Sequence, residues 1–253
     1  MNAEFPQKDY TRKKEEILKN RFSTWFQILR DLEMTSEPAH TVVRFPNSSS
    51  YVFSTGDDTF WMVDPAYARD GEADAEMEQI AGLMREKISF VLITHLHGDH
   101  CQAGLVRRVQ DSSIRWLVPS GIAEKFRDLC GIAADRILAL ENGTPVEFRN
   151  ISITAGRGYH NEPGKTKMEA GSYEIALPDG VTLFLPGDVR DFDAEVPASP
   201  VDYIFGHVFL GRDNACGNTF SKLDSFCRFM TGRKSSCLIL AHLYETGRAP
   251  EDL

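Results

Sequence analysis

Short apolar runs alternate with amphipathic stretches along most of the chain, and this alternation is typical of an α/β fold. Three β-like runs, 41–45, 50–54 and 59–63, follow one another closely and predict a β-meander. Residues 73–84 then carry apolar side chains at helical spacing, and an apolar run follows at 88–93. This order predicts a helix that leads into a buried strand, as in a βαβ crossover.

The same alternation continues toward the end of the chain. Helices are expected at 102–109, 122–129 and 220–230. Further strands are expected at 114–118, 136–140, 146–148, 151–155, 172–177, 181–185, 203–205 and 237–240. The strand over 151–155 is expected to lead into a Gly-rich loop that holds His160.

The N-terminal segment, residues 1–38, has an apolar stripe at helical spacing. The stripe consists of Leu18, Phe22, Trp25, Phe26, Leu29 and Leu32. We expect a helical extension that packs on a catalytic domain formed by residues 39–253, because a stripe with aromatic side chains usually finds its own core first. A dimerisation arm is the alternative, and homo-oligomerisation is left open.

Composition narrows the class of protein. Of the 253 residues, 42% are hydrophobic and 26% are charged, and no apolar run approaches the roughly 20 residues that cross a bilayer, so no membrane association is expected. Five scattered cysteines without a C-x-x-C pair argue against a disulfide framework and a thiolate zinc site, and favour a cytoplasmic location. A net charge of −9 lacks the basic footprint of nucleic-acid-binding proteins, so we expect a small-molecule substrate.

Candidate chemistry concentrates in residues 94–100, which read Thr-His-Leu-His-Gly-Asp-His directly after an expected buried strand. In an extended segment, residues at i and i+2 share a face, so His95 and His97 can hold one ion while Asp99 and His100 face a second. Imidazole and carboxylate donors without thiolate suit zinc, manganese or iron.

Three further candidate ligands, His160, Asp188 and His242, also follow predicted strands. Because the strand ends of open α/β sheets converge at one edge, we expect these side chains to lie near the heptapeptide. Unrelated core histidines would rarely produce this pattern.

The motif H-x-H-x-D-H after a buried strand resembles the hallmark of the metallo-β-lactamase superfamily, and the resemblance covers residues 41–242. It implies a four-layer αββα sandwich. By the same resemblance, the first metal is held by His95, His97 and His160, the second by Asp99, His100 and His242, and Asp188 bridges both. The segment Val63-Asp64-Pro65 is similar to an early turn of the family, which implies that Asp64 supports the site from behind the ligands.

Two divalent ions, with zinc expected and manganese or iron as alternatives, would let a metal-bridging hydroxide attack a small ester, lactone or phosphate ester. Asp99 is the natural candidate to orient that water and receive its proton. His207 could donate to a substrate oxyanion and Arg212 could bind a carboxylate or phosphate, although a structural histidine and a solvated arginine are the alternatives. The ending Leu-Ala-His-Leu at 240–243 resembles the small lactonase/phosphodiesterase-like branch of the superfamily.

Two other functions stay open at this point. One is a mononuclear iron oxidoreductase resembling the persulfide dioxygenases, which keep the histidine motif and load only the first site. The other is a non-catalytic member that binds a ligand. Metal analysis distinguishes the iron oxidoreductase from a hydrolase. A non-catalytic member would lack some of the metal ligands, whereas all seven ligand positions are filled in this sequence.

Overall fold

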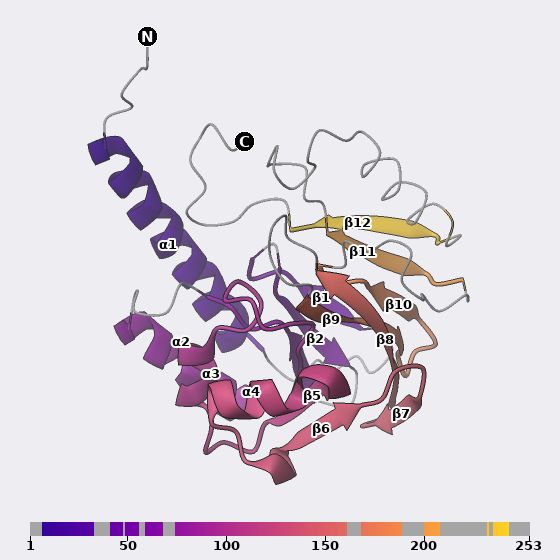
Figure 1. The fold of residues 1–253 in the computed structure, drawn as a ribbon. Coiled ribbons are helices and arrows are strands. Elements are labelled where there is room, and N and C mark those ends of the chain that lie inside the picture. The colour runs from indigo at the N-terminus through magenta and orange to yellow at the C-terminus, as the bar shows by residue number, and fades with distance from the viewer. Residues whose placement is uncertain are drawn as a thin grey trace.

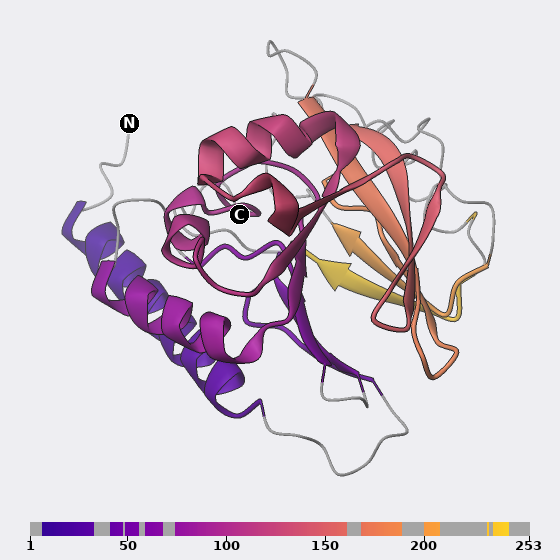
Figure 2. The ribbon, with the colours of Figure 1, turned by 90° about the horizontal axis from the view of Figure 1, so that it is seen from below.

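A computed structural model of the chain describes residues 7–32, 41–47, 49–55, 59–67, 74–160, 168–188, 200–207, 232 and 235–242. Two six-stranded sheets lie face to face in these ranges, and helices cover the outer face of the first sheet (Figure 1 and Figure 2). The strands of the first sheet all precede those of the second along the chain.

The first sheet begins as an antiparallel meander and continues with parallel strands. Its strands are, in spatial order, β1 (Val42–Arg44), β2 (Tyr51–Thr55), β3 (Thr59–Val63), β4 (Phe90–Leu92), β5 (Arg115–Pro119) and β6 (Ile137–Leu140). Parallel neighbours need crossover connections, which contain α2 (Asp74–Lys87), α3 (Ala103–Arg108) and α4 (Ala123–Cys130), with short 3₁₀ turns at Ser120–Ile122 and Ala134–Arg136. The meander and the crossovers predicted from the sequence are confirmed.

The second sheet repeats this change from antiparallel to parallel pairing. Its strands are β7 (Pro145–Phe148), β8 (Ile151–His160), β9 (Met168–Ala176), β10 (Thr182–Leu185), β11 (Tyr203–His207) and β12 (Cys237–Ala241). The strands β10, β11 and β12 are parallel, so their carboxyl ends lie at one edge of the sheet.

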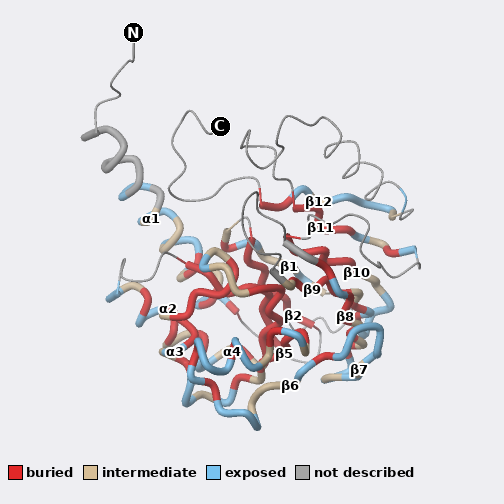
Figure 3. The backbone as a smooth tube through the Cα atoms, in the orientation of Figure 1, coloured by how far each residue is buried: buried red, intermediate tan, exposed pale blue. Residues whose placement is uncertain are grey.

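The alternation of side chains along β4 shows how both faces of the first sheet are buried. Phe90 and Leu92 point into the core between the sheets, whereas Val91 and Ile93 point into the core beneath the helices. A strand covered on both faces has no polar side, which explains why 88–93 is an apolar run and not an alternating one. Figure 3 shows the buried residues gathered in these two layers.

Helix α1 (Gln7–Arg30) packs on the helical layer through its C-terminal half. Trp25 and Leu29 have no exposed surface and belong to the same core cluster as Met77 and Ile80 of α2. The apolar stripe is therefore part of the core of this chain. A domain boundary after residue 38 stays a prediction.

One expectation about the second sheet was wrong. The strand expected to end at residue 155 continues as β8 to His160, which pairs with Met168 of β9. Gly156 and Gly158 weaken a strand but do not end it here, because β9 offers them partners throughout the ladder.

The α/β class predicted from the sequence is confirmed. The expected helix at 220–230 lies outside the described residues. Among the helices described, none is long and apolar enough to span a membrane.

Candidate metal centre

The candidate metal ligands whose side chains are described lie where parallel strands end. Residues 94–100 follow β4, Asp188 follows β10 by way of Pro186 and Gly187, and His242 follows β12 directly. The carboxyl ends of parallel strands from both sheets therefore face one another across a single edge of the sandwich, which is where such sheets place ligands.

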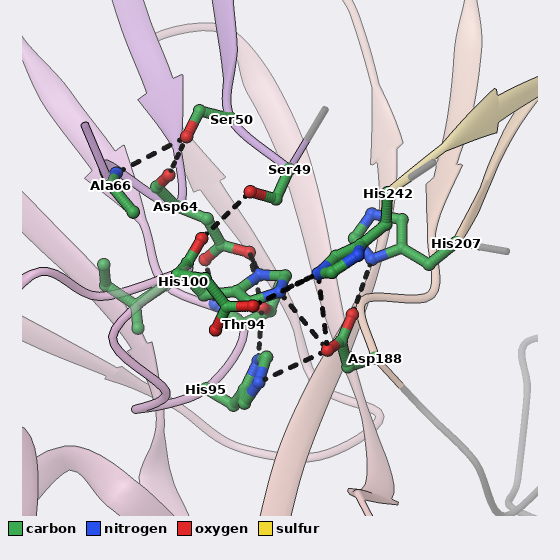
Figure 4. A network of polar contacts seen from close by, with 12 residues as sticks. Ser49, Ser50, Asp64, Ala66, Thr94, His95, His100, Asp188, His207 and His242 are labelled. Atoms are coloured by element: carbon green, nitrogen blue, oxygen red, sulfur yellow. Dashed lines mark hydrogen bonds and ion pairs between the residues drawn. The ribbon is translucent and has the colours of Figure 1, made fainter. Parts of the chain in front are cut away.

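Asp64, directly after β3, is the acceptor around which the heptapeptide is arranged (Figure 4). Its fully buried carboxylate accepts hydrogen bonds from Thr94 N at 2.7 Å and from Thr94 Oγ1 at 2.5 Å. It also lies 2.8 Å from His100 Nδ1. The Asp64 carboxylate holds the hydrogen of a neutral His100 ring on Nδ1. His100 Nε2, on the opposite side of the ring from Asp64, is then the nitrogen that can bind metal, as in many metal-binding histidines.

The rest of the motif folds as a tight turn. His100 N and Cys101 N both donate to His97 O, at 2.9 and 2.7 Å. Ser49 Oγ donates to Asp99 O at 2.9 Å, which ties this turn to the segment before β2. These bonds determine where the backbone of the motif lies, and through it where its side chains point.

Three groups of possible ligand atoms result among the described residues, and within each group the atoms lie within 4.8 Å of one another. The first group is His95, His97 and Asp188, and the second is Asp99, His100 and His242. The third group, His100, Asp188 and His207, shares one residue with each of the other two, so the first and second are the two groups with separate ligands.

Asp188 Oδ2 lies between the two groups. It is 3.7 Å from His95 Nε2, 3.3 Å from His100 Nε2 and 3.8 Å from His242 Nε2. His100 Nε2 and His242 Nε2 are only 3.0 Å apart, and His242 Nε2 is 3.5 Å from Asp99 Oδ2. One carboxylate oxygen thus faces donors from both sheets.

Gly187 allows this approach. Its φ is +58°, in the left-handed region that favours glycine. A Cβ at this position would lie 3.0 Å from Gly171 O and 3.1 Å from Thr94 Cβ. Because Gly171 N also donates to Thr94 O at 2.7 Å, the two sheets come into backbone contact here, and a larger residue would move Asp188.

His207, at the end of β11, is engaged with the protein through both ring nitrogens. Its Nδ1 lies 2.9 Å from Asp188 Oδ1 and its Nε2 lies 2.7 Å from the hydroxyl of Tyr51. The ring is buried, with 4% of its surface exposed. The sequence suggested a contact between His207 and substrate, and this geometry instead gives its hydrogen bonds to Asp188 and Tyr51.

Buried charges dominate the electrostatics of the site. Burial alone would lower the pKa of His100, but the carboxylates of Asp188 and Asp64 outweigh it and raise that pKa well above its usual value. Burial alone would raise the pKa of Asp188, but His100, His242 and His207 hold it well below its usual range. The carboxylates at this edge therefore attract positive charge, which a bound cation also supplies.

Comparison with known proteins places the chain in a family. Residues 51–242 match the family described as the Beta-lactamase superfamily domain, and this range contains every described residue of both ligand groups. The chain belongs to the metallo-β-lactamase superfamily. The family predicted from the H-x-H-x-D-H motif, and the sandwich fold it implies, are confirmed.

Several solved structures share the fold of this chain at low sequence identity. The metallo-β-lactamase fold protein YhfI from Bacillus subtilis is 19% identical, with a TM-score of 0.55 over 81% of this chain and 82% of its own. CmlA, a diiron beta-hydroxylase from Streptomyces venezuelae, is 16% identical, with a TM-score of 0.56 over 82% of this chain and 45% of its own. A possible metal-dependent hydrolase from Veillonella parvula is 16% identical, with a TM-score of 0.53 over 84% and 88%. A search of the curated proteins finds no match.

The structure of this metallo-β-lactamase superfamily member brings together six of the seven predicted ligands. They are His95, His97, Asp99, His100, Asp188 and His242. His160 ends β8, and its side chain is outside what the structure describes, as is the whole of Arg212. Asp64 contacts His100 through Nδ1, and its role as a residue that supports the ligands stays a prediction.

Sequence reasoning missed Tyr51. It lies in a short apolar strand that is buried throughout, where an aromatic residue indicates core packing, and its ring does belong to the core between the sheets. Only the position of its hydroxyl beside His207 reveals a polar role.

The described donors fit divalent transition metals. Both groups combine imidazole nitrogen with carboxylate oxygen, without thiolate, and lie within a few ångströms of one another. That chemistry suits zinc, manganese or iron better than calcium or magnesium, which prefer oxygen donors alone.

Proposed function

We propose that this protein is a metal-dependent hydrolase that uses two divalent ions to cleave a small ester, lactone or phosphate ester. The observation that carries the proposal is the position of Asp188 Oδ2 between two groups of ligand atoms, each with its own histidines. A carboxylate shared in this way is what a two-metal site requires.

His95, His97 and Asp188 would hold the first ion, with His160 as the further ligand that the family resemblance implies. Asp99, His100 and His242 would hold the second together with Asp188. When bound, such a pair supplies a nucleophile from water near neutral pH and polarises the group to be cleaved. Zinc is the metal we propose, and manganese or iron would use the same donors.

Asp99 is the most exposed of the described ligands. Its side chain is 43% exposed, whereas His97 is half-buried and the side chains of His242 and Asp188 are buried. A carboxylate at the solvent side of the site can orient an attacking water and receive its proton. Burial alone would raise the pKa of Asp99, but the hydrogen bond from His242 and the charge of His100 hold it below its usual value, so the carboxylate is ionised and can accept a hydrogen bond from water.

We further propose a small-molecule substrate, because the net charge of −9 disfavours a polyanion such as nucleic acid. The similarity to the Veillonella parvula protein, a possible metal-dependent hydrolase, agrees with a hydrolytic reaction. The similarity to CmlA, a diiron beta-hydroxylase, makes oxidation chemistry on iron the alternative to be tested.

Substitution of Asp99 tests the proposed function. Purified wild type is first analysed for metal and screened against lactones, thioesters, phosphodiesters and β-lactams. In Asp99→Ala we expect kcat on the best substrate to fall by roughly 10²–10⁴-fold, because the acceptor of the water proton is lost. The control is Asp128→Ala, which removes an exposed carboxylate that pairs with the neighbouring Arg127.

Undiminished hydrolysis by Asp99→Ala would contradict the role given to this residue. One iron per chain, with oxygen consumed and no ester or phosphate ester cleaved, would instead identify an oxidoreductase resembling the persulfide dioxygenases.

A further inference from the structure

A buried chain of hydrogen bonds ends on the carboxylate that lies between the two ligand groups. It runs from the hydroxyl of Tyr51 on β2 to His207 Nε2, and from His207 Nδ1 to Asp188 Oδ1. Tyr51 lies in β2 of the first sheet, whereas His207 ends β11 and Asp188 follows β10 in the second sheet. The three residues are 1%, 4% and 2% exposed, respectively. Buried polar groups placed in this way are costly unless they are fully paired, so the chain is a specified feature of the site.

The direction of the hydrogen bonds follows from the chemistry of the groups. An ionised carboxylate only accepts, so the hydrogen of a neutral His207 ring is on Nδ1 and is donated to Asp188. His207 Nε2 is then an acceptor, and the Tyr51 hydroxyl donates to it. The pKa of Tyr51 is raised by burial and by the charges of Asp64 and Asp188, which keeps the hydroxyl protonated as this direction requires.

The two oxygens of Asp188 have different surroundings as a result. Oδ1 accepts from His207 at 2.9 Å, whereas Oδ2 faces His95, His100 and His242. Without a partner for Oδ1, the carboxylate could rotate about its last bond and turn Oδ2 away from either ligand group.

We propose that Tyr51 and His207 are positioning residues that fix the Asp188 carboxylate with Oδ2 between the two ligand groups, and that they thereby set the affinity of the site for metal. The inference rests on the proposed two-metal function and extends it to two residues outside the ligand set. Hydrogen-bond partners of metal ligands typically change affinity by about 10–100-fold when they are removed.

The competing explanation is that His207 is itself a ligand. His207 Nδ1, Asp188 and His100 also form a group of atoms within 4.8 Å. A ligand must offer an unprotonated nitrogen to the ion, whereas a positioning residue need only donate a hydrogen bond to Asp188, so the two roles respond differently to substitution.

The test measures the affinity of the full chain for Zn²⁺ and Mn²⁺ by titration against a coloured chelator, with circular dichroism and thermal unfolding as checks on folding. We expect His207→Phe to weaken metal binding roughly 10–100-fold. His207→Asn is expected to recover most of this loss, because the Asn amide donates from the same position along the side chain as Nδ1.

Tyr51→Phe is expected to weaken binding about 3–10-fold, since it removes one buried hydrogen bond. It should have no further effect when His207 is already Phe, because it acts through that ring. The matched control is Tyr67→Phe, a tyrosine that is 1% exposed and whose hydroxyl donates to Leu18 O at 3.4 Å, in the other core cluster. Its metal affinity should equal that of wild type.

Other outcomes overturn the inference. Equal losses in His207→Asn and His207→Phe, with Tyr51→Phe unchanged, would make His207 a ligand. Lower unfolding temperatures with unchanged affinity would make the chain of hydrogen bonds purely structural. These results leave the proposed function intact, whereas a wild type that binds no Zn²⁺ or Mn²⁺ removes that function and the inference together.

Discussion

Asp188→Ala is expected to lose both metal ions and to reduce kcat/KM by roughly a thousandfold or more. Asp188 Oδ2 faces histidines of both ligand groups, 3.7 Å from His95 Nε2 and 3.3 Å from His100 Nε2. Metal ions contribute several kcal/mol of transition-state stabilisation, and about 1.4 kcal/mol corresponds to tenfold in rate. Elemental analysis after dialysis and steady-state kinetics on the same sample measure the two effects.

Asp188→Asn separates charge from shape in this experiment. The amide keeps the size of the side chain and an oxygen that can accept from His207, but it carries no negative charge. We expect it to retain the fold and still bind metal weakly. As a control, Asp179→Asn changes a carboxylate in the turn after β9 that accepts from Thr41 N, and it should have wild-type metal content. Two tightly bound ions in Asp188→Ala would contradict the shared role of this residue.

Asp64→Asn is expected to lower the free energy of unfolding by roughly 3 kcal/mol, because an amide presents a donor to groups that are themselves donors. The carboxylate accepts from Thr94 N and Thr94 Oγ1 and faces His100 Nδ1, all in a fully buried setting. Asn tolerates the left-handed φ of 51° found at this position, so backbone strain does not contribute to the result.

The same substitution should also weaken metal binding by about 10–100-fold, because it releases the ring orientation of His100. Urea unfolding followed by tryptophan fluorescence and a chelator titration give the two values. The control is Asp74→Asn, whose side chain is 69% exposed and pairs with Arg108, so its effect on unfolding should stay below about 1 kcal/mol. Unfolding of Asp64→Asn at the wild-type urea concentration would show that these hydrogen bonds do not support the site.

Much of the fold follows from local patterns. The apolar run at 88–93 is long enough to be a strand covered on both faces, and Phe90 and Val91 do enter different cores. The ends of parallel strands bring the heptapeptide, Asp188 and His242 to one edge of the sandwich. The sequence alone was therefore enough to predict that these residues lie together.

The remaining features depend on contacts between segments far apart in the chain. Asp64 and His242 are both non-glycine residues with positive φ, at 51° and 56°, and no local sequence signal predicts this conformation for them. It is maintained by the surrounding hydrogen bonds, as is common at functional sites. The hydrogen bond from Gly171 N to Thr94 O likewise joins the two sheets, and neither the sequence around Gly171 nor that around Thr94 predicts this contact.

Tyr51 and β8 illustrate two further limits. An aromatic residue in a short apolar strand predicts core packing, and the polar contact of the Tyr51 hydroxyl depends on a histidine 156 positions later in the chain. Gly156 and Gly158 predict a loop from their own conformational freedom, and only pairing with β9 extends the strand through them. In both cases the deciding partner is distant in sequence.

Anomalous diffraction from crystals of the zinc- or manganese-loaded protein would locate the proposed ions relative to the Asp188 carboxylate. We expect two anomalous peaks, one beside His95 and His97 and one beside His100 and His242, with Asp188 Oδ2 between them. A single peak beside His95 and His97, with none beside His100 and His242 at saturating metal, would contradict this expectation.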